Sequence, residues 1–570
     1  MRHAALLCSL VVSSFAFAAP PAKHSAGPRI EVTVTPAAAG SAPLTGRVLV
    51  AISKAAAGEP RTQIAESYES QQVFGMDVTA ATPGTPIVLD DANAYGYPIR
   101  HLADLPPGEY TVQAVFNRYE EFHLANGKTV LLPPDKGEGQ HWNTKPGNPM
   151  SKPVKLSFVK NAALTITADT TIPDPPAPAP DTKYIRHVRI RSELLSKFWG
   201  REMFVSAIVL LPEGFDSHPD THYPTVVYQD HFHPNFSAIG WRETPPPADL
   251  QGREAVRAKW QYAFYQAWTN GTLPHVLLIE PQHANPYYDD SYAVNSASIG
   301  PYGDAITQEL IPAVEKQFRG IGQGWARATY GGSTGGWEAL ASQVFYPEFY
   351  NGTWSFCPDP VSFHAYQGAD LYTDTNAYTR SGPFETIDIP SDRRGDSHIT
   401  AQMAQVNHYE LALGTHGRSG EQYDIWQAVF SPQGADGYPA PVYDKDTGAI
   451  DKEVVKYWHD HFDLDAILMR DWTTLGPKLE GKLHIAVGDS DTYYLNNAVY
   501  LLEADLKSTR NPHSDATFDF GPRKPHCYTG ALPEWDESQG ADMNQRVLPL
   551  MTRHMLETAP KDADTKSWVY

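Results

Sequence analysis

The chain has 570 residues, of which 41% are hydrophobic and 11% aromatic, so it is long enough for two or three domains and a large buried core. This composition argues against global disorder. The formal net charge of −21 argues against nucleic acid or an anionic membrane surface as a main partner, because both bind basic patches.

A processing signal occupies the start of the chain. "MRHAALLCSLVVSSFAFAAP" has a short basic start, an apolar middle and a small-x-small site ending at Ala18. We therefore expect residues 1–18 to be a signal peptide, and no later apolar run approaches the length of a membrane span. A lipoprotein anchor at Cys8 is the alternative, which the bulky Leu7 before it disfavours. The mature protein is expected to be secreted or periplasmic, without a membrane anchor.

Two regions with different patterns follow, joined by a proline-rich segment. Residues 28–168 contain short alternating runs such as "RIEVTVTP" and "GEYTVQAVF", separated by turn residues, which predicts an antiparallel β-sandwich domain. Residues 169–183 include "TIPDPPAPAPDTK" and should form an extended, semi-rigid linker. No catalytic cluster is evident before this linker.

Residues 184–558 have the pattern of an α/β domain. Short apolar runs alternate with helix-length segments, which indicates a buried, mostly parallel sheet. We expect strands within 187–192, 202–212, 224–229, 275–280, 326–330, 352–357, 482–488 and 516–520. A helix is expected over 303–320, with a stop at Gly320. Residues 370–480 are a long insertion between two strands, of a size that commonly makes a lid or a substrate wall.

A glycine-rich turn lies between an expected strand and an expected helix. In "ATYGGSTGGWEAL", residues 328–340, the segment Gly331-Gly332-Ser333-Thr334-Gly335 matches G-x-S-x-G, the nucleophile elbow. There the serine sits at the apex of a strained turn, and side chains on its neighbours would collide with the adjoining strand and helix. The alternative is a glycine-rich turn whose serine only caps the helix.

A serine nucleophile needs a base and an acid that orients the base, and in this architecture they follow in the order serine, acid, histidine. "HIAVGDSDTYYL" is an apolar strand followed by a loop with two aspartates. We favour Asp491 over Asp489, because its spacing after the strand carries it clear of the strand tip. His526 follows the last expected strand, where the base belongs, whereas His513 precedes that strand.

The oxyanion would be bound by two backbone N–H groups. One is that of Thr334, and the second should come from the loop "DHFHPNF", through His231 or Phe232. His231 and His233 form an H-x-H pair, but no third ligand is suggested nearby, so we expect no metal and no cofactor.

Two further patterns have alternative interpretations. "YDKDTGAID", residues 443–451, resembles half of a calcium loop, yet it lacks the terminal glutamate, which favours a hairpin turn. Cys8 leaves with the signal peptide, so Cys357 and Cys527 remain, either as buried free thiols or as a single disulfide.

With these residues in place, the chain resembles the α/β-hydrolase superfamily, and more narrowly the esterase group that includes esterase D and the enterochelin esterases. The resemblance covers roughly residues 184–558 and rests on "YGGSTGG", "VGDSD", "KPHCYTG" and "VVYQDHF". It implies an eight-stranded sheet and hydrolysis through an acyl-enzyme, with Ser333 as nucleophile, His526 as general base and Asp491 orienting it. Enterochelin-type proteins also carry an N-terminal β-domain. The glycine-free oxyanion loop and the long insertion depart from the group.

The sequence therefore predicts an exported serine esterase whose substrate is a small-molecule or glycan ester, such as a carbohydrate, feruloyl or siderophore ester. A serine peptidase of the same fold and a non-catalytic binding protein that kept the fold are the alternatives. Six aromatic residues are expected near the active-site loops: Tyr287, Tyr288, Tyr493, Tyr494, Trp241 and Trp337. Core packing would explain such residues equally well.

Overall fold

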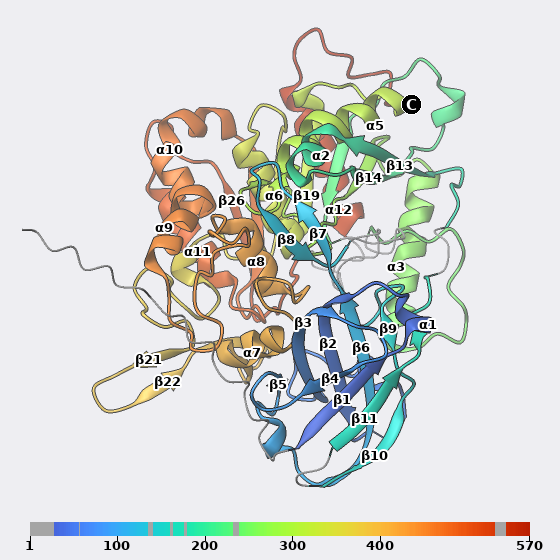
Figure 1. The fold of residues 1–570 in the computed structure, drawn as a ribbon. Helices are drawn as coiled ribbons and strands as arrows, with labels where there is room; N and C mark the ends of the chain where they lie inside the picture. The colour runs from blue at the N-terminus through green and yellow to red at the C-terminus, as the bar shows by residue number, and fades with distance from the viewer. Residues whose placement is uncertain are drawn as a thin grey trace, which may run out of the picture.

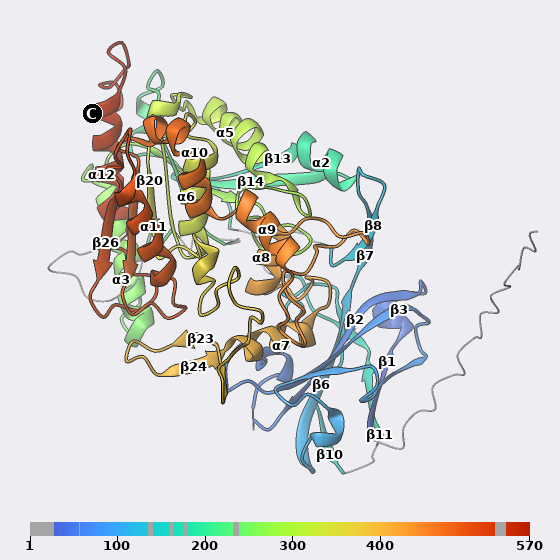
Figure 2. The same ribbon diagram turned by 90° about the vertical axis from the view of Figure 1, so that its left-hand side faces the viewer.

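The structure is a computed structural model, and it describes residues 28–55, 57–134, 141–159, 163–175, 179–231, 239–530 and 543–570. A β-rich N-terminal part lies against a larger α/β part (Figures 1 and 2). The expected signal peptide, residues 1–18, lies outside the described residues. Within the described ranges, no helix combines the length and apolar character needed to cross a membrane.

An eight-stranded sheet forms the centre of the α/β part. In order across the sheet, its strands are β13 (Ile185–Ser192), β14 (Met203–Leu210), β16 (Leu277–Gln282), β15 (Thr225–Gln229), β19 (Arg327–Gly332), β20 (Thr353–Phe356), β25 (Leu483–Gly488) and β26 (Thr517–Gly521). The pairings of β14 with β13 and β16 are antiparallel, and the five others are parallel. Each strand coincides with one of the eight predicted apolar runs, so the mostly parallel sheet is confirmed.

Helices cover this sheet and bury its apolar residues. They are α2 (Glu193–Trp199), α3 (Gly252–Thr269), α5 (Ile311–Phe318), α6 (Thr334–Phe345), α10 (Leu464–Leu479), α11 (Asn496–Ser508) and α12 (Met543–Thr558). Helix α6 packs against β15, β19 and β20, and α10 packs against α6 and α11. The helix expected over 303–320 is present in three parts, α4 (Tyr302–Asp304), a π-helical segment (Ala305–Leu310) and α5. The wider turn precedes Pro312, which lacks the N–H that a regular helix requires. The helix ends at Phe318 before Arg319, whose φ is 58°, rather than at Gly320.

Two sheets make up the N-terminal part. One has the order β11 (Ala163–Ala168), β1 (Arg29–Val34), β4 (Pro86–Leu89). The other has the order β12 (Thr170–Thr171), β9 (Pro149–Met150), β6 (Gly108–Arg118), β2 (Leu44–Ser53), β3 (Gln72–Ala81), β5 (Tyr95–Tyr97), with β10 (Val154–Phe158) paired to β6. Residues of both sheets share one buried hydrophobic cluster. The pairing of β1 with β11 is parallel, unlike the antiparallel arrangement expected, and such a pairing needs the long connection that separates these two strands.

A β-hairpin of the N-terminal part inserts into the core of the α/β part. It consists of β7 (Glu120–His123) and β8 (Thr129–Leu132), and its buried residues belong to the main hydrophobic cluster. The ring of Phe122 packs edge-on against Trp199 of α2, with centroids 5.5 Å apart. The two parts therefore share a core rather than touching only through a linker.

Two arginines strengthen the junction around Asp77. Arg47, only 2% exposed, donates to the carbonyls of Leu411 and Ala412 at the end of α7 (Met403–Leu413) and to Asp77. Arg418 binds the other Asp77 oxygen at 2.9 Å. Burial alone would raise the pKa of Asp77, but the two guanidinium groups outweigh burial and lower it. The N-terminal part is thus fixed to the insertion by a charge-assisted network.

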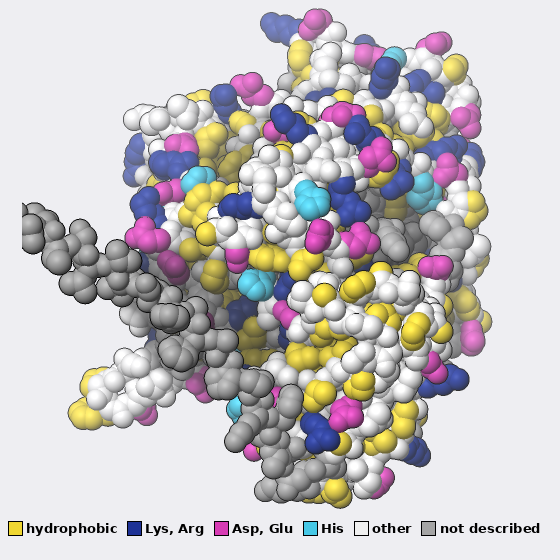
Figure 3. Space-filling model, in the orientation of Figure 1, with side chains coloured by type: hydrophobic (Ala, Val, Ile, Leu, Met, Phe, Trp, Pro, Cys, Tyr) yellow, Lys and Arg dark blue, Asp and Glu magenta, His cyan; other side chains and the backbone are white. Residues whose placement is uncertain are grey.

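The predicted insertion, 370–480, contains two small hairpins and three helices before α10. These are β21 (Thr379–Ser381) with β22 (Thr386–Asp388), β23 (Pro390–Arg393) with β24 (Ile399–Gln402), α7, α8 (Gln422–Phe430) and α9 (Lys452–His461). The β21–β22 hairpin projects from the body (Figures 1 and 3). On the face in Figure 3, acidic and basic side chains are interspersed.

Two smaller features complete the fold. Residues 443–451 form a hairpin turn with a bridge between Tyr443 and Ile450, as predicted, and the Asp444 carboxylate accepts hydrogen bonds from within the turn. The chain also continues to pack beyond 558, where we expected the catalytic domain to end. Trp568 is 1% exposed, and the Tyr570 ring stacks on His275 with centroids 4.1 Å apart.

Candidate active site

Ser333 lies in a sharp turn between β19 and α6. Its φ of 59° and ψ of −124° are a conformation that residues with a side chain rarely adopt. Two hydrogen bonds hold the turn, because Ser333 N donates to Phe356 O at 3.0 Å and Ser333 O accepts from Trp337 N at 3.1 Å. The sheet edge and the first turn of α6 thus fix the backbone that carries the hydroxyl.

The neighbouring glycines allow the strand and the helix to approach closely. A Cβ on Gly335 would lie 1.9 Å from Gln229 O of β15, and a Cβ on Gly331 would lie 2.4 Å from the same atom. Gly332 differs, since a Cβ there would meet nothing nearer than 3.9 Å. The crowding predicted from sequence therefore holds for two of these glycines and not for Gly332.

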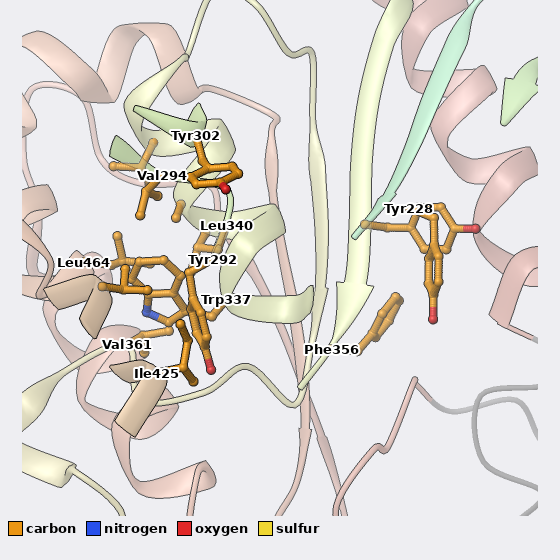
Figure 4. Packing of buried hydrophobic residues seen from close by; sticks show 14 of the residues in the cluster. Tyr228, Tyr292, Val294, Tyr302, Trp337, Leu340, Phe356, Val361, Ile425 and Leu464 are labelled. Carbon is orange, nitrogen blue, oxygen red and sulfur yellow. The ribbon is translucent and has the colours of Figure 1, made fainter. Parts of the chain in front are cut away.

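Large aromatic residues anchor the helix that follows Ser333. Trp337 is fully buried, and its ring packs against Tyr292 and Phe430 with centroids 5.5 and 5.0 Å apart. Figure 4 shows Trp337 and Tyr292 close to the aliphatic side chains of Val361, Ile425 and Leu464. Trp337, which was expected near the active-site loops, is thus a core residue that holds α6 in place.

The structure brings Ser333, His526 and Asp491 together. Ser333 Oγ and His526 Nε2 are 2.8 Å apart, and His526 Nδ1 and Asp491 Oδ2 are also 2.8 Å apart. Asp491 is fully buried, and its Oδ1 accepts from the backbone N–H groups of Tyr493 and Leu495. With Nδ1–H donating to the carboxylate, Nε2 faces the serine hydroxyl as an acceptor for its proton.

The alternative acid and base lie elsewhere. Asp489 Oδ1 accepts from Arg523 N at 2.5 Å and from the Ser490 hydroxyl at 3.3 Å, so it caps the loop that carries His526. His513 precedes β26, and its Nδ1 contacts Thr509 O at 3.1 Å.

The two cysteines lie next to His526. Both are free, and the buried Cys357 thiol hydrogen-bonds to Cys527. The pKa of Cys527 is lowered to about 5, chiefly by this hydrogen bond. Burial acts in the opposite direction, and the neighbouring His526 lowers this pKa further. Burial lowers the pKa of His526, but Cys527 and Asp491 outweigh burial and raise it well above the ordinary value.

The oxyanion candidates occupy different environments. Thr334 is the first residue of α6, where backbone N–H groups have no partner within the helix. The N–H of His231 donates to Asp230 Oδ1 at 2.8 Å. Phe232 and His233 lie outside the described residues.

The side chain of His231 belongs to a cluster that the sequence did not reveal. Its Nδ1 lies 2.7 Å from Asp290 Oδ2 and 3.1 Å from Asp289 Oδ1. Burial lowers the pKa of His231, but the two carboxylates outweigh burial and raise it well above the ordinary value. These three residues, and separately Cys357, His526 and Cys527, place ligand atoms close enough to hold a metal ion. The ion pairs already explain why His231 and its two carboxylates converge.

A cleft with a volume of ≈ 490 Å³ opens onto Ser333 and His526. Of the six aromatic residues expected near the site, Tyr493 alone is among the described residues that line this cleft, and its ring packs edge-on to His526 at 4.8 Å. Others were missed from sequence, including Glu66 of the N-terminal part and Gln367, Gln422, Tyr423 and Trp426 of the insertion. These residues reach the cleft only because segments that are distant in the sequence pack together in the fold.

The chain has the arrangement of the α/β-hydrolase fold, in its strand order, in the strand–turn–helix at Ser333 and in the chain order of Ser333, Asp491 and His526. Residues 196–408 match the family model described as "Putative esterase". The predicted resemblance to α/β-hydrolase esterases is therefore confirmed, and the enzyme class is a carboxylic ester hydrolase.

Solved structures also resemble the chain. A ferulic acid esterase has a TM-score of 0.38 and 13% identity, covering 65% of this chain and 98% of its own. An S-formylglutathione hydrolase from Agrobacterium tumefaciens has a TM-score of 0.33 and 13% identity, covering 66% and 98%. A fluorophosphonate-binding serine hydrolase from Staphylococcus aureus has a TM-score of 0.31 and 13% identity, covering 65% and 99%. At these scores the likenesses carry no information on substrate. A comparison with the curated proteins finds no match.

Proposed function

We propose that the protein is an exported serine esterase that cleaves carboxylic esters through an acyl-enzyme on Ser333. The observation that carries this proposal is the hydrogen-bonded series Ser333–His526–Asp491 facing the cleft. His526 Nε2 takes the serine proton as Oγ attacks the ester carbonyl, and the imidazolium then protonates the leaving alcohol. Asp491 keeps the imidazole in the required tautomer and stabilises its charge. Water then attacks the acyl-enzyme in the same way, with His526 as the general base, and the acid is released.

The position of Ser333 at the helix terminus supports stabilisation of the oxyanion. The N–H of Thr334 lies at the positive end of the α6 dipole, close to where negative charge develops on the attacked carbonyl oxygen. A second donor from the loop that carries His231 and Phe232 completes this proposal. Removal of a single such donor costs about 10²–10³ in kcat in comparable enzymes.

The lining of the cleft favours an uncharged ester. Glu66, Asp230 and Asp359 contribute carboxyl groups, and neither lysine nor arginine occurs among the described residues that line it. An anionic substrate would therefore find no guanidinium or ammonium group among these residues to pair with. A carbohydrate or feruloyl ester therefore fits better than a polyanionic siderophore ester.

Two features of the wider chain belong to the same proposal. The two-sheet packing supports a β-sandwich domain over 28–168, which helps to position the catalytic part. Residues 1–18 would direct export, and the N-terminal sequence of the protein purified from culture medium or periplasm tests this cleavage.

Replacement of the nucleophile tests the proposal. We expect Ser333→Ala to abolish hydrolysis of p-nitrophenyl acetate and labelling by a fluorophosphonate probe, with an unchanged circular dichroism spectrum. Ser490→Ala is the matched control, because this serine lies in a neighbouring loop and its hydroxyl donates to Asp489. Wild-type turnover by Ser333→Ala would overturn the assignment.

A further inference from the structure

A second cavity lies at the junction of the N-terminal part and the insertion, where α7 packs against β5 (Figure 1). Its volume is ≈ 570 Å³, within the range of small-molecule sites. Both parts of the chain line it, with Tyr68, Tyr95, Tyr97, Arg100 and His101 on one side and Gln405, His408 and Asp446 on the other.

One loop of the N-terminal part borders both this cavity and the catalytic cleft. The loop joins Thr62 to β3, and it places Glu66 in the cleft and Tyr68 in the second cavity. Glu66 and Tyr68 are two residues apart, so one short segment reaches both cavities. The two cavities are therefore neighbours separated by this loop.

The catalytic base is linked to the same loop through an aromatic side chain. Tyr493 packs on His526 with ring centroids 4.8 Å apart, and burial followed by the charge of Glu66 raises the pKa of Tyr493. Glu66 and Tyr493 both line the catalytic cleft, and Tyr97 lines the second cavity. A ligand with its reactive group at Ser333 would meet this loop and then the second cavity.

The lining of the second cavity combines aromatic faces with planar polar groups. The Tyr68 side chain is 77% exposed, although solvent exposure of a tyrosine ring is unfavourable. Arg100 stacks over the Tyr95 ring at 3.7 Å, and the Tyr95 hydroxyl donates to Asp446 at 2.9 Å. Sugars present apolar C–H faces that pack on aromatic rings, and hydroxyls that bond to guanidinium, carboxylate and amide groups. The carboxylate of Asp446 balances the guanidinium of Arg100 in this lining, so the cavity suits a neutral ligand.

We propose that this second cavity binds the sugar portion of the substrate, a neutral oligosaccharide whose ester group reaches Ser333 past Glu66. This inference rests on the proposed esterase function and names its substrate class. It gives the N-terminal part and the insertion a shared role, since each supplies one side of the cavity. Tyr68 is then a specificity-determining residue that touches the sugar and not the reacting atoms.

Binding is tested first without any ester. Xylohexaose, cellohexaose and maltohexaose are each titrated into the wild-type protein and into Tyr68→Ala by calorimetry. We expect one of the three to bind the wild type, and Tyr68→Ala to weaken that binding about 5- to 10-fold, as loss of one stacking contact predicts. Phe384→Ala is the matched control, because Phe384 is a fully exposed aromatic residue on the distant β21–β22 connection.

Kinetics then separate the two proposals. On an acetylated form of the oligosaccharide that binds, Tyr68→Ala should raise KM about 5- to 10-fold with little change in kcat, while turnover of p-nitrophenyl acetate stays at the wild-type level. The inference is overturned if none of the three sugars binds, or if Tyr68→Ala and Phe384→Ala behave alike. Absence of p-nitrophenyl acetate turnover in the wild type would instead refute the esterase function, and the titrations would still report on the cavity.

Discussion

A methyl group at position 335 tests whether close packing of the turn controls the reactivity of Ser333. In Gly335→Ala the new Cβ would lie 1.9 Å from Gln229 O and 2.5 Å from Gln229 C. Carbon atoms in favourable contact are about 3.5–4.0 Å apart, so α6 and β15 would have to separate by more than about 1 Å. Both contacts are with backbone atoms, which no side-chain rotation relieves. Overpacking of this kind costs about 1–3 kcal/mol.

The same displacement would move Ser333, which lies two residues earlier. A shift of about 1 Å in a catalytic group costs about 10²-fold in rate, so we expect kcat for p-nitrophenyl acetate to fall about 100-fold. Scanning fluorimetry should show a Tm lower by several degrees. In Gly332→Ala the nearest atom would be 3.9 Å away, so its Tm should stay within about 1 °C of the wild type. Equal Tm and kcat for the two variants would refute the packing argument.

Three further predictions concern the acid, the pH profile and the junction. Asp491→Asn should lower kcat about 10³- to 10⁴-fold through loss of the imidazole tautomer, whereas Asp489→Asn should cost less than about 10-fold, and a similar loss in both would contradict the geometry. Cys527→Ala removes a negative charge that raises the pKa of His526, so the acid limb of kcat/KM should move to lower pH; an unmoved limb contradicts this. Asp77→Asn should lower the free energy of unfolding by about 2–3 kcal/mol in urea titrations, less than for a fully buried pair because Asp77 is 35% exposed. The pKa of Asp77 is lowered in the folded protein, so the ionised carboxylate stabilises the fold above about pH 3.9, and this contribution is lost as the pH falls below that value. The free energy of unfolding of Asp77→Asn should therefore change less with pH in this acid range than that of the wild type.

The central sheet was predictable because each of its strands is a short apolar run bounded by turn residues. The turn at Ser333 was visible for a similar local reason, since Gly331 and Gly335 approach Gln229 too closely for any side chain. Chain order then led to Asp491 and His526, and in the structure His526 contacts both Asp491 and Ser333. In each case, the signal lay within a few consecutive residues.

The walls of the site gave no such local signal. Trp241 and Trp337 were expected near the active-site loops, yet Trp241 packs among Tyr184, Phe264 and Trp268, and Trp337 packs in the core. A large aromatic residue has the same appearance in sequence whether it fills a core or lines a cleft. The carboxylates beside His231 follow it by almost sixty residues, and only the folded chain brings them together.

The reacting atoms and the surface opposite them come from different stretches of the chain. Ser333 and His526 are held by the central sheet, whereas Glu66 reaches the cleft from a short polar loop on the other side of the linker. Exchange of that loop would leave the elbow, its glycines and the buried aspartate untouched. The loop proposed to contact the substrate can therefore be varied apart from the reacting residues, and laboratory evolution aimed at new substrates has a compact target of nine positions, 63–71, between Thr62 and Gln72.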